Sequence, residues 1–190
     1  MGQRPYARNW TKSSTFIRLE VINMRFSKIK DNDIANGVGI TMSLWTQGCP
    51  HHCKGCFNTE TWDYNGGKEF TDKDLKYILN NINKNNIKRN LAILGGEPLC
   101  PQNVRGVIEL CKKFKKVYPE KMIYLWTGYV VEDFNFTQKK IFKYIDVLVD
   151  GKFEEDKKNL SIMLRGSSNQ RVIDVNKSLS NHDIVMYEVG

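Results

Sequence analysis

The chain has 190 residues, of which 41% are hydrophobic and 26% are charged. This length fits one globular domain with its own core, and no apolar run reaches the roughly 18 residues of a membrane helix. The net charge of +8 comes from lysines scattered along helical stretches, which indicates solvated helix faces. We therefore expect neither a nucleic acid nor a membrane as a partner.

Residues 1–23 are basic and lack core-forming periodicity outside 16–22. We expect them to be an N-terminal extension that is not native; the alternative is an extra edge strand over 16–22. No signal-peptide pattern is seen, so the five cysteines indicate a reducing cytoplasm rather than a disulfide framework. Residues 24–190 are expected to form a single domain.

Along the rest of the chain, runs of apolar and β-branched residues alternate with segments whose apolar residues recur at helical spacing. Strand–helix alternation predicts βαβ crossovers and a mostly parallel sheet. With four or five such units, fewer than a closed barrel needs, we expect an α/β fold that is an open, partial parallel (β/α) barrel. The expected strands are 38–46, 91–94, 122–126 and 146–150; the expected helices start at the capping pattern 71–74, span 102–118 and lie near 137–145.

A cysteine loop follows the first of these strands. Cys49, Cys53 and Cys56 are spaced C-x3-C-x2-C, and three thiolates this close predict a metal or cluster. One interpretation is a [4Fe–4S] cluster with one iron left open, and the other is a zinc site completed by His51 or His52. We expect both histidines to face solvent or to act behind the ligands, because their geometry inside the loop is awkward.

The remaining cysteines have other surroundings. Cys111 shares a helical face with apolar residues, so it is expected in the core. Cys100 lies in a different loop between Pro98 and Pro101, where it is a weak candidate for a fourth ligand.

The next strand ends at Gly95-Gly96-Glu97-Pro98. Two glycines let the backbone approach a ligand closely, and Glu97 offers a negative charge for an amino group. Alone, this stretch is an ordinary strand-to-helix turn. Following the cysteine loop by about 40 residues, at another strand end, it indicates a small-molecule site.

Later polar residues lie at the same end of the sheet. Thr127 follows the third strand, where it is expected to contact the ligand, whereas Trp126 is expected in the core. The segment 165–171 is expected near the ligand cleft or a partner surface. Either of its arginines, Arg165 or Arg171, can pair with a carboxylate.

These motifs together resemble the radical S-adenosylmethionine (SAM) enzymes and, within them, the small activating proteins of anaerobic ribonucleoside-triphosphate reductase. The resemblance covers about residues 24–175, and one departure is Gly55, where many members carry an aromatic residue. Here Phe57 is the candidate to cover the adenine instead. The stretches that carry the resemblance are 36–37, 47–58, 61–62, 95–99, 101–103, 126–129, 146–153 and 165–171.

The resemblance implies the radical SAM type of partial barrel, one [4Fe–4S] cluster on the three cysteines, and SAM on the open iron. It implies reductive cleavage of SAM, hydrogen abstraction from a glycine of the reductase large subunit, and a reduced flavodoxin as electron donor. Catalysis would need no residue beyond the cluster and SAM. The implied SAM contacts are Gly55, Cys56, Phe57, Gly95, Gly96, Glu97, Thr127 and Arg165.

Two alternatives remain at this stage. One is an activator of another glycyl radical enzyme, such as pyruvate formate-lyase. The other is a non-catalytic zinc-binding interaction module.

Overall fold

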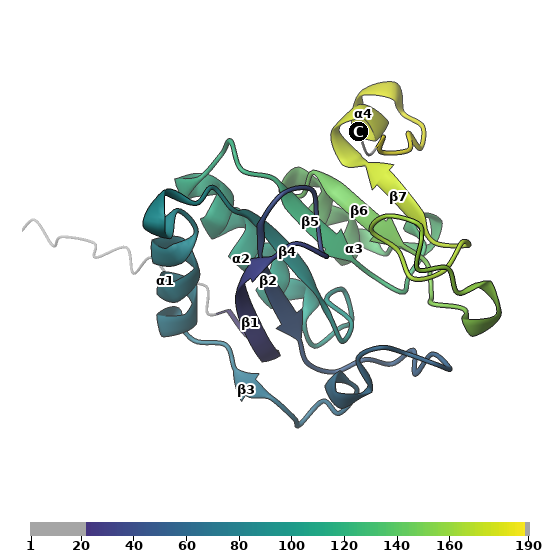
Figure 1. Ribbon diagram of the computed structural model, residues 1–190, viewed down its shortest axis with the longest axis horizontal. Coiled ribbons are helices and arrows are strands. Elements are labelled where there is room, and N and C mark those ends of the chain that lie inside the picture. Colours follow the sequence, from purple (N-terminus) through teal and green to yellow (C-terminus); the bar gives the residue numbers. More distant parts are fainter. Residues whose placement is uncertain (1–21, 189–190) are drawn as a thin grey trace, which may run out of the picture.

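A seven-stranded sheet forms the centre of the protein (Figure 1). The computed structural model describes residues 22–188, so the predicted extension and its alternative edge strand lie outside the described residues, apart from 22–23. The strand order is β3-β1-β2-β4-β5-β6-β7. The strands are β1 (Arg25–Asp33), β2 (Thr41–Thr46), β3 (Lys68–Glu69), β4 (Asn90–Gly95), β5 (Ile123–Trp126), β6 (Val147–Asp150) and β7 (Arg171–Asp174).

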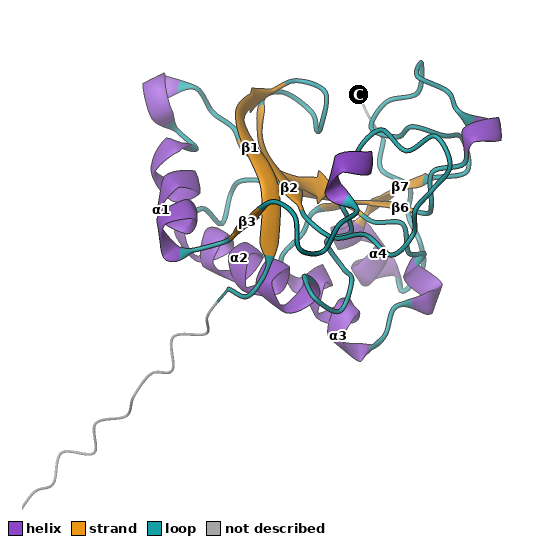
Figure 2. Cartoon of the chain, turned by 90° about the horizontal axis from the view of Figure 1, so that it is seen from below, coloured by secondary structure: helices purple, strands orange, loops and turns teal. Residues whose placement is uncertain are grey.

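Helices α1, α2 and α3 lie on one side of this sheet (Figure 2). Apolar residues of α1 and α2 join one large core cluster with alternate residues of the strands. The α-helices are α1 (Asp72–Asn81), α2 (Val104–Val117), α3 (Phe136–Lys139) and α4 (Val175–Asn181). Short 3-10 helices span Thr59–Thr61, Lys84–Asn86, Val131–Asp133, Lys140–Lys143 and Glu155–Lys157.

The sheet is mixed, and our expectation of an open, partial parallel (β/α) barrel was wrong. Only β2, β4, β5 and β6 pair in parallel. β1 is antiparallel to β2 and β3, and β7 is antiparallel to β6. The return through 34–40 is too short for a parallel crossover, so β2 runs antiparallel to β1. The segment 151–170 is longer but contains no α-helix, and it leads into a β7 that is antiparallel to β6.

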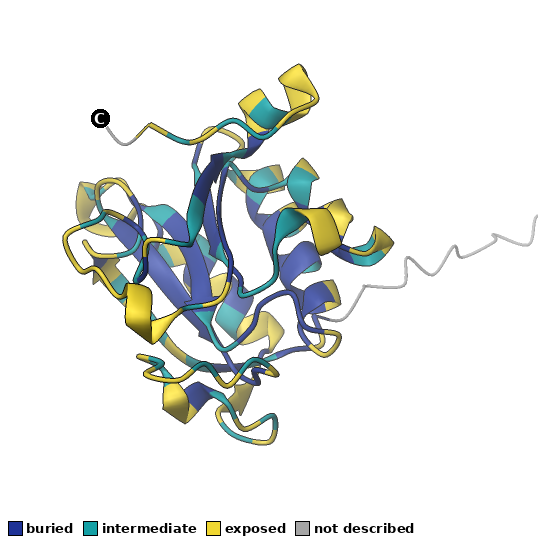
Figure 3. Cartoon of the chain, turned by 90° about the vertical axis from the view of Figure 1, so that its right-hand side faces the viewer, coloured by how far each residue is buried: buried dark blue, intermediate teal, exposed yellow. Residues whose placement is uncertain are grey.

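The two faces of the sheet have separate apolar cores. In β4, Leu91 and Ile93 face the helices, whereas Ala92 and Leu94 join a second cluster on the other face. This alternation follows from the two-residue period of a strand. The central strands are almost entirely buried (Figure 3), and the second face is closed by Leu164 from the segment after β6.

Two local predictions, one on each of the first two helices, are confirmed. Helix α1 begins after Thr71, whose backbone N–H donates to the Asp74 carboxylate at 2.8 Å. Cys111 is fully buried in the core on α2. Between residues 22 and 188, no helix is long and apolar enough to cross a bilayer.

Candidate functional site

The four parallel strands end at one edge of the sheet, and a cavity of about 530 Å³ opens there. Such an edge is where open α/β sheets place ligands. The residues expected to hold the cluster or to contact SAM line this cavity, with Gly55 as the exception. They are Cys49, Cys53, Cys56, Phe57, Gly95, Gly96, Glu97, Thr127 and Arg165.

The cysteine loop is anchored at its start by the segment that follows it. Gly48 N–H donates to the Thr61 carbonyl at 2.8 Å, and Cys49 N–H donates to the Trp62 carbonyl at 3.1 Å. The buried Gln47 amide donates to two further carbonyls of the same segment, at 2.8 and 3.1 Å. The loop therefore leaves β2 in a fixed direction.

The three cysteines line the cavity and form no disulfide. Burial raises the pKa of Cys49 to about 11 and also raises the pKa of Cys53. The Cys56 sulfur accepts a hydrogen bond from Asn58 N–H at 3.4 Å. Metal binding requires the thiolate form, so a metal that binds here has to displace the protons of these buried thiols.

The two histidines of the loop have partners of their own. His51 Nε2 lies 2.8 Å from Glu97 Oε2 and its side chain is only 8% exposed. The exposed His52 stacks on the Trp62 indole at 4.6 Å between centroids. In the described part of the chain, no three His, Cys, Asp or Glu side chains form a ready-made site for one metal ion.

Both glycines of the stretch after β4 are required by close backbone packing. Gly95 has φ +104°, and a Cβ there would lie 2.8 Å from the Trp45 Cα. A Cβ on Gly96 would lie 2.6 Å from the Gly48 carbonyl oxygen. The backbone of this turn is thus pressed against the start of the cysteine loop, and Glu97 N–H donates to that same Gly48 oxygen at 2.8 Å.

The Glu97 carboxylate is fully buried, accepts three hydrogen bonds and lies within hydrogen-bond distance of His51 Nε2, which is the fourth donor when that nitrogen carries the ring proton. Oε1 accepts from Leu99 N–H at 2.8 Å and from the Thr127 hydroxyl at 2.7 Å. Oε2 accepts from Gly128 N–H at 2.7 Å and faces His51. Four partners occupy all the lone pairs of a carboxylate. Glu97 was expected to face the amino group of a ligand, but its partners in the structure are groups of the protein itself.

Two residues at the end of β5, Trp126 and Thr127, also have internal partners. The Thr127 hydroxyl points to Glu97, as described above. Trp126 was expected in the core; it packs on the second apolar cluster, lines the cavity and donates its indole N–H to the Leu164 carbonyl at 2.7 Å. These contacts join the end of β5 to the turn after β4 and to the segment after β6.

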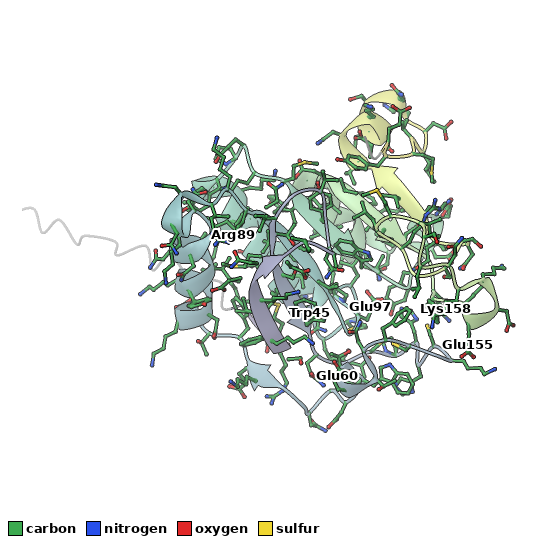
Figure 4. The ribbon with its side chains drawn as sticks, in the orientation of Figure 1. Trp45, Glu60, Arg89, Glu97, Glu155 and Lys158 are labelled. Carbon is green, nitrogen blue, oxygen red and sulfur yellow. The ribbon has the colours of Figure 1, made fainter. Side chains whose placement is uncertain are left out.

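The segment 151–170 folds against the outer side of the cysteine loop. Phe57 meets Phe153 edge-on at 5.1 Å between centroids, and Lys158 Nζ lies 5.1 Å from the Phe57 ring centroid. Gly55 has φ +70°, and a Cβ there would meet the Glu155 side chain. Figure 4 shows Glu155 and Lys158 on this segment, with Glu97 between them and Trp45 in that view.

The arginines of the stretch 165–171 have different roles. Arg171 donates to Asp150 at 2.9 Å and to both Glu132 oxygens at 2.7 and 2.8 Å, which fixes β7 to β6. Arg165 donates to the Gln170 carbonyl at 2.7 Å, but its Nε is buried without a partner. Trp62 Nε1 is likewise buried and unpaired, and both side chains line the cavity.

Several lining residues were missed from the sequence. The cavity wall also includes the apolar side chains Trp45, Leu94, Phe153 and Leu164. Asn36 was quoted as part of a motif, but without a role. Apolar residues at strand ends look like core residues in a sequence, so no spacing pattern could have identified them.

Comparisons with known proteins agree with the cysteine loop. Residues 35–173 match the family model of a 4Fe-4S single cluster domain, which supports an iron–sulfur cluster. Three similar proteins are each named anaerobic ribonucleoside-triphosphate reductase-activating protein. The one from Escherichia coli (strain K12) is 41% identical over 78% of this chain and 97% of its own length. Those from Haemophilus influenzae and Enterobacteria phage T4 are 37% and 39% identical, over 77% and 84% of this chain and 96% and 100% of their own lengths.

Proposed function

Because the chain belongs to the family of anaerobic ribonucleoside-triphosphate reductase-activating proteins, we propose that it installs a glycyl radical on that reductase by radical SAM chemistry. The observation that carries the proposal is the position of the three thiols. Cys49, Cys53 and Cys56 line one cavity, whereas the two histidines of the loop are paired with Glu97 and Trp62. Three protein ligands leave one iron of a [4Fe–4S] cluster for a substrate.

The chemistry of the walls fits both groups. Thiols are the usual protein ligands of an iron–sulfur cluster. Two lining residues, Trp62 and Arg165, each have a buried N–H donor without a protein partner, which suits an anionic or carbonyl acceptor. The volume of about 530 Å³ is within the usual range for small-molecule sites.

When bound, a reduced [4Fe–4S] cluster would supply one electron that breaks a C–S bond of SAM, giving methionine and a 5′-deoxyadenosyl radical, which takes a hydrogen atom from the reductase glycine. The protein's own residues hold and orient the reactants. The Arg165 guanidinium pairs with the SAM carboxylate, and the backbone of Gly95 and Gly96 binds the amino end. Thr127 supports that end indirectly, because its hydroxyl donates a hydrogen bond to the Glu97 carboxylate.

The adenosine is expected on the outer side of the cysteine loop. The backbone at Gly55 and Cys56 and the half-exposed ring of Phe57 contact it there. Trp45, Leu94 and Leu164 give the opposite walls an apolar surface that excludes water from the reacting atoms. A reduced flavodoxin in the cytoplasm is the proposed electron donor, and the reductase large subunit is the proposed partner.

Anaerobic reconstitution with iron and sulfide tests the proposal. The wild-type chain is expected to bind close to four irons and to cleave SAM when reduced. Cys53→Ala is expected to lose both properties, whereas Cys111→Ser should keep them, because Cys111 lies in the core away from the cavity. A colourless protein that holds one zinc and leaves SAM intact would refute the proposal, as would a cluster-loaded, active Cys53→Ala variant.

A further inference from the structure

The bond between His51 and Glu97 joins the cysteine loop to the rest of the site. His51 lies between Cys49 and Cys53, in a stretch without helix or strand. Backbone bonds hold the loop at Cys49 and, through Cys56 N–H to the Cys53 carbonyl, near its end. The side chain of His51 therefore supplies a tertiary contact in the middle of the loop.

The imidazole of His51 is packed between the side chain of Tyr129 and the backbone of Gly128. It meets the Tyr129 ring edge-on, with centroids 4.6 Å apart. It also lies close to Gly128, where a Cβ would come within 2.7 Å of Nε2. The absence of a side chain at Gly128 is what makes room for the ring beside Glu97.

Glu97 is the common partner of three loops. Its carboxylate is bonded to the cysteine loop through His51, to its own turn through Leu99, and to the turn after β5 through Thr127 and Gly128. Asn103 adds to this connection, because its side-chain amide donates to the carbonyls of Glu97 and Gln47 at 3.0 and 2.8 Å. One buried carboxylate thus fixes the relative positions of all three loops.

We propose that His51 and Glu97 form a buried clamp that holds the cysteine loop in its ligand-binding conformation, with Glu97 acting as a positioning residue rather than as a contact to SAM. The inference rests on the proposed function only in that Cys49, Cys53 and Cys56 hold a cluster. A carboxylate with four internal donors has no lone pair left for the amino group of a ligand. Binding one there would break a bond that orders the site.

The clamp predicts how firmly the cluster is held. His51→Ala is expected to speed the loss of iron from the reconstituted protein to a ferrous chelator by about tenfold, as expected for groups that orient metal ligands. His51→Gln is expected to restore a rate near that of the wild type, because its side-chain amide can donate to Glu97. If glutamine restores the rate, the hydrogen bond to Glu97 is what matters, and not the imidazole ring itself.

The neighbouring histidine offers a matched control. His52 lies in the same loop but is exposed, stacks on Trp62, and has φ +46°, which asparagine tolerates. His52→Asn is expected to leave the iron-loss rate unchanged. Glu97→Gln is expected to speed iron loss, and the added effect of His51→Ala on that background should be small, since the two residues act as one unit.

The iron-loss assays can overturn the clamp in several ways. A wild-type rate in His51→Ala, an equal increase in His52→Asn, or full additivity with Glu97→Gln would overturn the clamp. If His51→Ala takes up no cluster, His51→Gln decides: normal loading supports the clamp, and failure to load overturns it. The assay needs no SAM cleavage, so a chain that holds iron but leaves SAM intact refutes only the proposed function. A wild-type chain without iron refutes both.

Discussion

Replacing Gly96 by alanine tests whether the glycine pair after β4 is required by the fold itself. A Cβ at this position would lie 2.6 Å from the Gly48 oxygen and 3.0 Å from the Thr61 oxygen. Both are backbone atoms, so no side-chain rotation can relieve the contact. The Gly48 oxygen is also fixed by the hydrogen bond from Glu97 N–H at 2.8 Å.

The size of the effect follows from two opposing contributions. Crowding of this kind in a packed region costs about 1–3 kcal/mol. Alanine also restricts the unfolded chain, which stabilises the protein by about 0.4–1 kcal/mol. Crowding is the larger, so Gly96→Ala is expected to lower the free energy of unfolding by about 1–2 kcal/mol. For a chain of this size, the melting temperature should fall by about 2–8 °C.

Urea unfolding of the metal-free protein, without SAM, is the appropriate assay, because any loss then belongs to the fold and not to ligand binding. Gly39→Asn is the control: the space around Gly39 is open and its φ of +76° suits asparagine, so its stability should change by less than about 0.5 kcal/mol. A Gly96→Ala protein as stable as the wild type would refute the reasoning. The glycine would then be explained by ligand contact alone.

Two further substitutions test the site and the fold. Arg165→Gln is expected to raise the KM for SAM about tenfold with little change in bound iron, because it removes the proposed partner of the SAM carboxylate; an unchanged KM would contradict that role. Arg89→Ala is expected to lower the free energy of unfolding by about 2–3 kcal/mol, because the buried Arg89 donates to carbonyls at and beyond the end of α1, including Asn81 at 3.2 Å and Lys84 at 3.0 Å (Figure 4). The exposed Lys88→Ala serves as its control, and equal losses in the two variants would count against this explanation.

The sequence predicted the parallel centre of the sheet but missed the antiparallel strands at its edges. β2, β4, β5 and β6 are buried, apolar runs and were located to within a few residues. β1 alternates buried or half-buried residues with exposed ones such as Lys28 and Lys30, so its apolar signal is weak. β7 has only four residues, and its pairing with β6 depends on a return that local sequence does not encode.

The candidate site shows the same division. The three cysteines lie within eight residues of one another, and the two glycines are adjacent. Local spacing was therefore enough to identify each group. His51 was expected either to face solvent or to act behind the ligands, and the sequence could not decide between the two, because its bond to Glu97 joins residues 46 positions apart. Glu97 was assigned to a ligand because its internal partners, among them Thr127 and Gly128, lie on another strand's end.

The central claim is that this chain places a radical on a glycine of the reductase. Electron paramagnetic resonance tests it directly, using a frozen anaerobic mixture of the cluster-loaded protein, SAM, a reductant and the reductase. The account predicts a glycyl radical doublet that is absent without SAM, absent with Cys53→Ala, and absent when the reductase glycine is replaced by alanine. A mixture in which SAM is cleaved but no doublet appears on the reductase would contradict it.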